Sequence, residues 1–311
     1  MSVKAGVIGV GYLGRHHARI YSELEGVELA AVVDRDLSIA EEIAAKYGAR
    51  AYTDYVRAIE GLQAVSIVTP TPMHFDIALA CMRAGCDVLV EKPITLTVDE
   101  AERLVNEADK LGRILQVGHL ERYNPAFIAI SKMIDGLKFV ESERVSPFLE
   151  RAAGVDVTLD LMIHDIDIVM SLVNGAGIKD INVVGAKVLS GKVDVAKAWI
   201  EFDGGVSALI TANRLSGQKR RVLKVFQRDS YLVLDYQKKS IQKYFKGPDG
   251  ISSESIDIED KEPLKEEISD FLDCVVTRRR PIVSGIEGMN ALKVAIDITE
   301  KINGKSGTEN T

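Results

Sequence analysis

The sequence lacks several features that mark whole classes of protein. Only three of its 311 residues are cysteines. The spacing of Cys81, Cys86 and Cys274 matches no metal-ligand motif and fits a reducing compartment. No apolar stretch approaches the roughly 20 residues that span a bilayer, and the amino terminus enters a strand-like segment without a signal peptide. We therefore expect a cytoplasmic protein with no metal and no membrane partner.

An excess of basic residues is also missing. Lys and Arg number 39 against 46 Asp and Glu, which leaves a net charge of −7. Because phosphate backbones attract basic proteins, this balance argues against a nucleic-acid partner. The short basic runs 219–221 and 278–280 are interpreted as exposed faces or local anion contacts.

A glycine-rich turn near the amino terminus is the first strong motif. Gly9-Val10-Gly11-Tyr12-Leu13-Gly14 follows the apolar run 5–8 and leads into a helical pattern over 15–24. The glycines alone are weak evidence, but strand, turn and helix are the context in which this motif binds a dinucleotide. Gly9 permits the tight turn, Gly11 lets backbone N–H groups reach the pyrophosphate, and Gly14 allows close helix–strand packing.

An acidic residue follows at the spacing that dinucleotide sites require. The next strand, 27–33, ends at Asp34, which lies 20 residues beyond Gly14. A carboxylate there accepts hydrogen bonds from the ribose hydroxyls, so the sequence favours NAD over NADP. Arg35 keeps NADP open as the alternative, because an arginine at that position can pair with a 2′-phosphate.

Strand-like and helical segments alternate through residues 1–120. This alternation predicts a Rossmann domain: a doubly wound parallel sheet with its ligands at the carboxyl ends of the strands. Helices are expected at 15–24, 38–47, 54–60 and 73–84, and from the capping box Thr97-Val98-Asp99-Glu100 to 111; strands are expected at 5–8, 27–33, 64–68, 87–90 and 114–117.

Three loops follow strand ends and should therefore converge on the cofactor. They are Thr69-Pro70-Thr71-Pro72, Glu91-Lys92-Pro93 and Gly118-His119. Proline after Lys92 keeps the backbone of the lysine extended, and a lysine held there can hydrogen-bond a substrate hydroxyl or help to carry its proton. Taken alone, this lysine would be interpreted as a surface residue in a loop.

The pattern changes near residue 121, and we expect a second, α+β domain over 121–311. Asn124-Pro125 is typical of an N-cap and first turn, here for a helix to 135. Six segments rich in β-branched and aromatic residues predict a large, mostly antiparallel open sheet. The last helix is expected to pack back on the Rossmann domain. The strands are predicted at 139–145, 181–189, 193–202, 206–212, 222–227 and 231–235, and the closing helices at 263–277 and 285–303.

A second polar constellation lies inside this domain. Asp160, His164 and Asp167 are spaced i, i+4 and i+7 in a helical pattern that runs to 172. A carboxylate one turn from a histidine orients the ring and raises its pKa, which makes it a better proton acceptor. From residue spacing alone, an ion pair on an exposed helix face is slightly favoured over this catalytic reading. A metal site is a third reading, without any further His or Cys cluster to support it.

These motifs together resemble the glucose–fructose oxidoreductase, inositol dehydrogenase and rhizopine-catabolism family (Gfo/Idh/MocA). The likeness runs from the first strand to the last helix, and the order of Glu-Lys-Pro and Asp-x-x-x-His after the glycine turn is specific. The matching segments are 9–14 with His17-Ala18, 69–74, Glu91-Lys92-Pro93, Asp160-x-x-x-His164 and 283–288.

The resemblance implies a set of roles. A sugar or cyclitol hydroxyl would lose its proton to His164 while its carbon loses hydride to NAD; Lys92 would hold that hydroxyl, and Asp160 would contact the substrate or orient His164. Relatives commonly form oligomers, which implies a homodimer or homotetramer. The residues implied at the cofactor are Gly9, Gly11, Tyr12, Leu13, Gly14, Asp34, Arg35, Thr69, Pro70, Thr71, His74, Glu91 and Lys92.

A narrower likeness concerns the substrate. Segment 117–127 is similar to that of the bacterial UDP-N-acetylglucosamine 3-dehydrogenase branch, which implies oxidation of the 3-hydroxyl of a UDP-N-acetylhexosamine, either UDP-N-acetylglucosamine or its uronic acid. Residues implied at the substrate are Lys92, Arg122, Tyr123, Asn124, Arg151, Asp160 and His164, with Arg144 and Arg214 as further cations for a diphosphate.

Other readings stay open at this point. The chain departs from many relatives in lacking a glycine-rich stretch at 154–159, before Asp160. A free cyclitol or monosaccharide is the alternative substrate, and a sensor that binds a dinucleotide without turnover is the alternative of another class. Retention of both Lys92 and His164 favours an enzyme.

Overall fold

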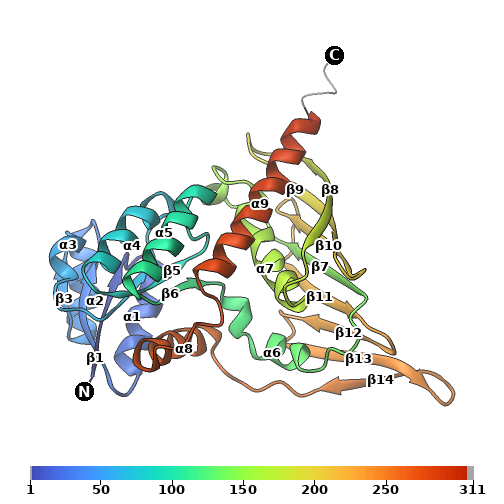
Figure 1. The fold of residues 1–311 in the computed structure, drawn as a ribbon, viewed down its shortest axis with the longest axis horizontal. Coiled ribbons are helices and arrows are strands. Elements are labelled where there is room, and N and C mark those ends of the chain that lie inside the picture. Colours follow the sequence, from blue (N-terminus) through green and yellow to red (C-terminus); the bar gives the residue numbers. More distant parts are fainter. Residues whose placement is uncertain (1, 307–311) are drawn as a thin grey trace. The chain divides into compact units, whose positions relative to one another are not determined.

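A computed structural model describes residues 2–306, apart from the side chains of Arg151, Lys305 and Ser306. The chain forms two compact units. The first contains the residues up to 123 together with 262–290, and the second contains 124–261 together with the residues from 291 onward (Figure 1). Within the described chain, no helix is long and apolar enough to cross a membrane.

The first unit is built on a six-stranded parallel sheet with the order β3-β2-β1-β4-β5-β6. The order reverses between β1 and β4, which creates the crevice at the carboxyl ends of the strands where ligands of such sheets bind. The strands are β1 (Val3–Ile8), β2 (Val27–Val33), β3 (Arg50–Tyr52), β4 (Ala64–Ile67), β5 (Asp87–Glu91) and β6 (Leu115–Gly118).

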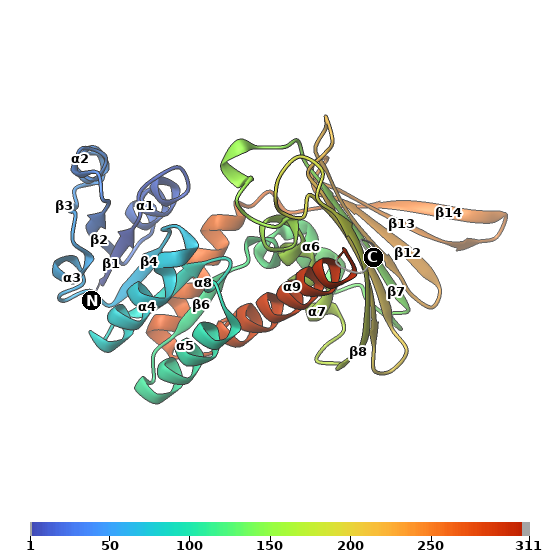
Figure 2. The same cartoon turned by 90° about the horizontal axis from the view of Figure 1, so that it is seen from above.

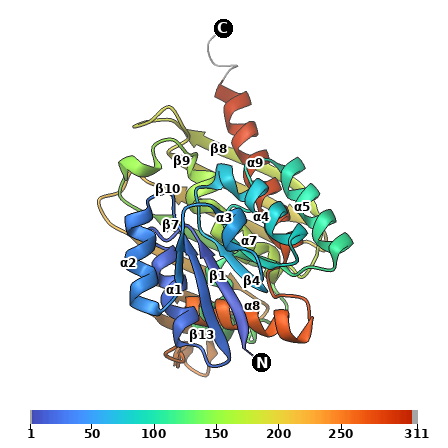
Figure 3. The ribbon, with the colours of Figure 1, turned by 90° about the vertical axis from the view of Figure 1, so that its left-hand side faces the viewer.

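Helices cover both faces of this sheet. α1 and α2 share a buried apolar core with α8, whereas α4 and α5 pack together; Figure 3 shows the two pairs on opposite sides of the strands. The predicted capping box opens α5 and is confirmed, because Thr97 and Glu100 exchange side-chain and backbone hydrogen bonds. The helices are α1 (Gly14–Glu23), α2 (Leu37–Tyr47), α3 (Tyr55–Ala58), α4 (His74–Arg83), α5 (Val98–Leu111) and α8 (Pro263–Thr277).

Residues 262–290 lie in the first unit, although the sequence assigned them to the second domain. The reason is apolar burial and strand-edge pairing. Ile268 and Phe271 of α8 are fully buried in the core that α1 shares, and the amide of Val117 donates to the carbonyl of Val283 at the edge of β6. Helix α9 (Gly285–Ser306) begins in this unit and ends in the second.

The second unit contains an eight-stranded sheet with the order β14-β13-β12-β11-β7-β10-β9-β8. Every neighbouring pair is antiparallel except β7 and β10. This confirms the predicted fold class, a Rossmann sheet followed by a mostly antiparallel open sheet. The strands are β7 (Phe139–Val145), β8 (Ile178–Ala186), β9 (Val195–Phe202), β10 (Ser207–Asn213), β11 (Arg220–Phe226), β12 (Ser230–Asp235), β13 (Ser240–Gly247) and β14 (Gly250–Ile256).

Side-chain alternation explains why this sheet is covered on one face. In β9, Ala198 and Ile200 are buried in the core, whereas Trp199 between them points to the other face. Helices α6 (Pro125–Ser131), α7 (Ile163–Leu172) and the second part of α9 cover the apolar face, as Figure 2 shows. The predicted N-cap of α6 is confirmed, because the Asn124 side chain accepts from the amide of Ala126.

A buried ion pair joins β7 to α7 on the covered face of the second unit. Nε of Arg144 on β7 donates to Oδ2 of Asp165 on α7 at 2.6 Å, and Oγ of Ser142 donates to the other carboxylate oxygen at 2.6 Å. Both charged side chains are buried. The assignment of Arg144 to a substrate diphosphate was therefore wrong, because the guanidinium neutralises a buried carboxylate.

We predict that Asp165→Ala lowers the free energy of unfolding by about 3 to 5 kcal/mol, because it leaves a buried guanidinium without its counter-charge. Urea unfolding measures the loss. Glu254→Ala breaks the exposed pair with Lys243 on the same sheet and should cost less than about 1 kcal/mol. If the two variants lost the same free energy of unfolding, the fold would depend no more on the buried pair than on the exposed one.

Candidate active site

The glycine turn is shaped by two close backbone approaches. Gly9 has φ +89°, in the left-handed region that favours glycine, and a Cβ there would lie 2.7 Å from the carbonyl oxygen of Val68. A Cβ at Gly14 would overlap the carbonyl oxygen of Gly9, so α1 can start this close to β1 only from a glycine. Open space surrounds the corresponding position at Gly11, which leaves the backbone accessible to a ligand.

Helix α1 begins at Gly14 without a side-chain cap at Leu13. The first N–H groups of a helix have no partner within the helix, and they favour an anion through their partial positive charge. The amides of Arg15 and His16 donate to the carbonyls of Gly11 and Leu13, but no side chain caps this start. Its partial positive charge at the reversal point of the sheet is therefore suited to a pyrophosphate.

Asp34 stands beside this turn at the end of β2. Its Oδ2 accepts from the amide of Val10 at 3.0 Å and its Oδ1 accepts from the amide of Asp36 at 3.1 Å. These bonds hold the carboxylate next to the glycine turn, where ribose hydroxyls would reach it. Arg35, the residue that keeps NADP open, is exposed.

The loop after β4 is tied to the Glu91-Lys92-Pro93 segment by a buried histidine. His74 places Nε2 2.8 Å from the carbonyl oxygen of Thr69 and Nδ1 2.9 Å from that of Pro93. Its ring is almost completely buried, and burial lowers the pKa of His74 although both carbonyl contacts oppose this. His74 thus joins the loop after β4 to the segment after β5, and its place at the cofactor stays a prediction.

An unsatisfied hydroxyl marks the same edge. Oγ1 of Thr69 is buried and has no hydrogen-bond partner among the residues described. A buried polar atom without a partner costs free energy unless a ligand or water satisfies it. Together with the uncapped helix and the open space at Gly11, this hydroxyl fits a polar dinucleotide at the carboxyl end of the sheet.

Lys92 follows the last residue of β5 and precedes Pro93 in a cis peptide bond. It lies in the neighbourhood of a buried histidine, His119. Burial, with the charges of Lys92 and Arg122 nearby, lowers the pKa of His119 to about 3. The charges of Lys92 and Arg122, both predicted at the substrate, thus act on the same buried histidine after β6.

The predicted Asp160 and His164 belong to the second unit. A π-helical turn, Thr158–Met162, contains Asp160 and precedes α7, which contains His164 and Asp167. A π-helical turn is wider than an α-helical turn. Asp160 and His164 are therefore not related by the rotation that a regular i, i+4 spacing assumes. Asp160 and His164 are half-buried and Asp167 is buried, so the stripe is not the exposed helix face that spacing alone favoured.

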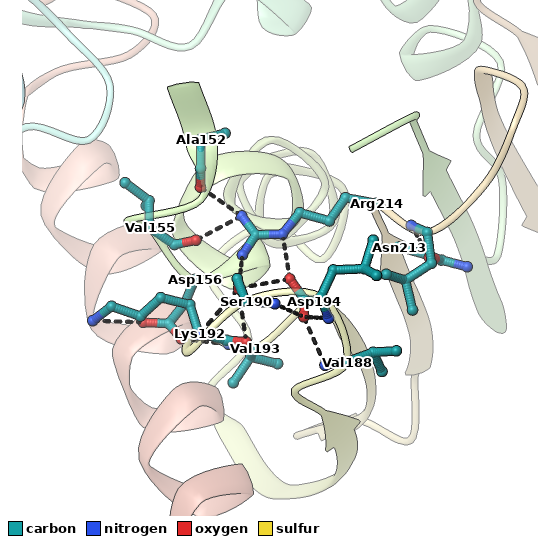
Figure 4. Close-up of polar contacts among 12 residues, drawn as sticks. Ala152, Val155, Asp156, Val188, Ser190, Lys192, Val193, Asp194, Asn213 and Arg214 are labelled. Atoms are coloured by element: carbon teal, nitrogen blue, oxygen red, sulfur yellow. Dashed lines mark hydrogen bonds and ion pairs between the residues drawn. The ribbon is translucent and has the colours of Figure 1, made fainter. Parts of the chain in front are cut away.

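A buried cluster fastens the segment that leads to Asp160 (Figure 4). Arg214 donates from Nε to Oδ1 of Asp194 at 2.8 Å and from Nη1 to the carbonyls of Ala152 and Val155, each at 2.7 Å. The assignment of Arg214 to a diphosphate was wrong for the same reason as that of Arg144. Both partners of this ion pair are buried, and the guanidinium is occupied by the protein's own acceptors.

Asp194 is held by backbone amides as well. Burial alone would raise the pKa of Asp194, but the amides of Val188, Ser190 and Leu189, with Arg214, lower it well below its usual range. Asp156 continues the cluster, because its Oδ1 accepts from the amide of Val193 at 2.8 Å. The segment 152–156 is therefore fixed by buried charge, without the glycine-rich stretch of many relatives.

Two further predicted substrate residues have structural partners. Tyr123 is buried, and its hydroxyl donates to Oδ2 of Asp270 at 2.7 Å. Asn124 caps α6. Arg151 lies in the turn Glu150–Ala152, and its side chain is outside the described part of the structure.

Sequence reasoning missed a buried acidic residue on α8, Glu267. Glu267 is fully buried although it is charged in water. It lies on the same stripe of α8 as Leu264, Ile268 and Phe271, at i−3, i+1 and i+4, and an acidic residue in an apolar stripe is the signal that would have found it. Within the described residues, no group of three His, Cys, Asp or Glu side chains is placed to hold a metal ion.

Comparisons with known proteins agree with this geometry. A family model described as "Oxidoreductase family, NAD-binding Rossmann fold" matches residues 3–119. UDP-N-acetylglucosamine 3-dehydrogenase from Acidithiobacillus ferrooxidans is 34% identical over 303 residues, covering 95% of this chain and 96% of that protein. A solved structure of that enzyme has a TM-score of 0.93 at 33% identity and covers 98% of both chains.

A cyclitol enzyme is also similar over most of its length. The scyllo-inositol 2-dehydrogenase (NAD(+)) of Bacillus subtilis is 29% identical over 96% of this chain and 93% of that protein. The match to an NAD-binding Rossmann fold confirms the predicted cofactor, NAD.

The pKa of His119 predicts a pH dependence of stability. An unfolded histidine titrates near about 6.5, so between about pH 6.5 and about 3 the unfolded chain binds the extra proton. The free energy of unfolding should fall as the pH falls through this window, by up to about 1.4 kcal/mol per pH unit. Urea unfolding of wild type and His119→Asn at about pH 5 and about pH 7 isolates the contribution of His119. Between these pH values, the free energy of unfolding should fall less in the variant than in wild type. Equal drops would contradict a buried, neutral His119.

Proposed function

We infer the function of this chain from its family: it belongs to the Gfo/Idh/MocA oxidoreductases, which have the NAD-binding Rossmann fold. It is an NAD-dependent oxidoreductase that acts on CH–OH groups of a sugar. Its proposed reaction is oxidation of the 3-hydroxyl of a UDP-N-acetylhexosamine, UDP-N-acetylglucosamine or its uronic acid, to the 3-keto nucleotide sugar.

The observation that supports this substrate is the similarity to the Acidithiobacillus enzyme over nearly the whole of both chains. Because that similarity includes the second unit, it extends to the segments around Asp160 and His164 and not to the Rossmann fold alone. Arg122, near Lys92 and His119 in the first unit, is the proposed cation for the diphosphate, since Arg144 and Arg214 are occupied by buried carboxylates.

The proposed roles follow from the chemistry of alcohol oxidation. Lys92 donates a hydrogen bond to the reacting hydroxyl and holds its oxygen. His164 accepts the hydroxyl proton as the C–H bond breaks, and Asp160 orients the histidine or contacts the sugar. When bound, NAD supplies the acceptor for the hydride. The residues proposed to hold it are the glycine turn, Asp34, the loop from Thr69 and Glu91.

A cyclitol or a free monosaccharide is the second candidate substrate. The similarity to scyllo-inositol 2-dehydrogenase favours it specifically, because that match also covers both units. The two candidates differ in the need for a nucleotide, so a direct comparison of substrates decides between them.

We predict that NADH forms, measured by its absorbance, with NAD and UDP-N-acetylglucosamine or its uronic acid, and not with free N-acetylglucosamine or myo-inositol. NADP in place of NAD should be the poorer cofactor. Lys92→Met and His164→Asn should bind NAD normally and lose turnover by roughly 100-fold or more. Lys110→Met, at an exposed lysine, is the control. Activity only with free polyols would contradict the nucleotide-sugar proposal.

We further propose that the uncovered face of the eight-stranded sheet joins copies of this chain into a homodimer or homotetramer. Five aromatic rings stack across that face with centroid separations of 4.5–5.6 Å. Two of them, Trp199 and Tyr244, remain 38% and 36% exposed. The same face presents both Glu141 and Lys224, and mixed charges suit a self-complementary contact. The rings are Phe139, Trp199, Phe226, Tyr231 and Tyr244.

This proposal predicts an oligomer by light scattering at micromolar concentration. Trp199→Glu should shift it toward smaller species, because a charge would be buried at the centre of the contact. Val276→Glu, at an exposed position of α8 in the first unit, should leave the mass unchanged. A monomeric wild type would overturn the proposal.

A further inference from the structure

A chain of buried polar side chains crosses the face of the Rossmann sheet that α1 covers. Ser66 of β4 and Leu89 of β5 are paired in register, so their side chains share one face, and Glu91 returns to that face two residues later. From α1, Tyr21 places its hydroxyl 2.8 Å from Oγ of Ser66, and His17 places Nδ1 3.1 Å from the same oxygen. All three are fully buried.

Which group donates in each of these hydrogen bonds follows from Tyr21, at the end of the series. Burial raises the pKa of Tyr21, so its hydroxyl keeps its proton, and the hydroxyl of Ser66 is the partner that can receive it. Among the described residues, Oγ of Ser66 has no hydrogen-bond partner besides Tyr21 and His17, so its own proton has only Nδ1 of His17 as an acceptor. In the opposite direction, the buried O–H of Tyr21 would have no acceptor, which costs free energy.

This direction fixes the tautomer of His17. With Nδ1 accepting, the proton of the neutral ring lies on Nε2. Nε2 is 3.2 Å from Oε1 of Glu91, an ion-pair contact that does not have the geometry of a full hydrogen bond. No other partner of Nε2 is found among the described residues. The N–H of His17 therefore faces the carboxylate of the residue before Lys92.

Space for that carboxylate comes from β6. A Cβ at Gly118 would lie 2.9 Å from the carboxyl atoms of Glu91, so the absence of a side chain there lets Glu91 lie across the end of the strand. The Glu91 side chain keeps 14% of its surface exposed, at the carboxyl edge where ligands of a doubly wound sheet bind. His17 and Gly118 together define one position for it.

A second buried acid, Glu267 of α8, lies near Glu91. Burial, together with Glu91 and Asp270 nearby, raises the pKa of Glu267 well above its usual value. Neither carboxyl oxygen of Glu267 has a hydrogen-bond partner in the part of the chain that the structure describes, as expected for a protonated acid better than for a carboxylate.

We propose that His17 is a positioning residue for Glu91: the relay from Tyr21 through Ser66 holds its Nε2–H toward the Glu91 carboxylate, and this fixes the start of the Glu91-Lys92-Pro93 segment for NAD binding. The inference rests on the proposed place of Glu91 at the cofactor, and it is independent of which sugar is the substrate.

The tautomer is the first test. The chain has five histidines, and ¹⁵N-histidine labelling with long-range ¹H–¹⁵N NMR distinguishes a proton on Nδ1 from one on Nε2. A His17→Gln sample identifies the resonances of this ring. The inference requires a neutral His17 with its proton on Nε2 alone. A proton on Nδ1, in the neutral or the charged ring, would overturn it.

A matched pair of variants tests the consequence for the cofactor. The amide nitrogen of glutamine reaches the position of Nε2, whereas that of asparagine reaches only the position of Nδ1. His17→Asn should therefore weaken NAD binding, measured by calorimetry, by roughly tenfold, because the N–H that faces the Glu91 carboxylate is lost. His17→Gln should restore most of the affinity. Equal affinities in the two variants would contradict the proposal.

The binding assay keeps this inference separate from the proposed substrate. If wild type binds NAD but oxidises no UDP-sugar, the substrate proposal fails and the comparison of His17→Asn with His17→Gln is unaffected. If UDP-N-acetylglucosamine is oxidised and both variants bind NAD as wild type does, the positioning role fails and the function stands.

Discussion

The close approach of Gly14 to Gly9 is the constraint on which the cofactor site depends. No residue with a Cβ could start α1 so near the end of β1. This placement points the start of the helix toward the position predicted for the pyrophosphate, and one and two turns later it sets His17 and Tyr21 against Ser66 of β4. Helix α8 then packs on α1 and supplies Glu267. The predicted cofactor site and the proposed relay thus both depend on where α1 begins.

Much of the fold could be predicted because its signals are local. The apolar runs of the Rossmann strands, the capping box at Thr97 and the N-cap at Asn124 depend on neighbouring residues, and the structure has all of them. Strands β13 and β14 were missed because they lie at the edge of the sheet, where both faces are largely exposed and Lys, Gln and Ser replace the apolar alternation. The return of α8 to the first unit was missed because contacts between distant segments leave no local pattern.

The site was predictable in its residue types and less so in their surroundings. The glycine turn, Asp34 and Lys92 could be singled out because motif spacing and strand ends place them, and their roles stay predictions. Arg144 and Arg214 were misassigned, since a sequence shows that a residue is cationic but not that Asp165 and Asp194 already neutralise it. The π-helical turn at 158–162 could not be predicted either, because the sequence pattern was compared only with the spacing of a regular helix.

The most direct test of the proposed reaction follows one hydrogen atom. UDP-N-acetylglucosamine with deuterium only at C3 is incubated with this protein and NAD, and the reduced cofactor is analysed by mass spectrometry. Oxidation at the 3-hydroxyl predicts that deuterium is transferred to the nicotinamide. Reduced cofactor without deuterium would mean that the hydride leaves another carbon, and no reduced cofactor at all would mean that this nucleotide sugar is not the substrate.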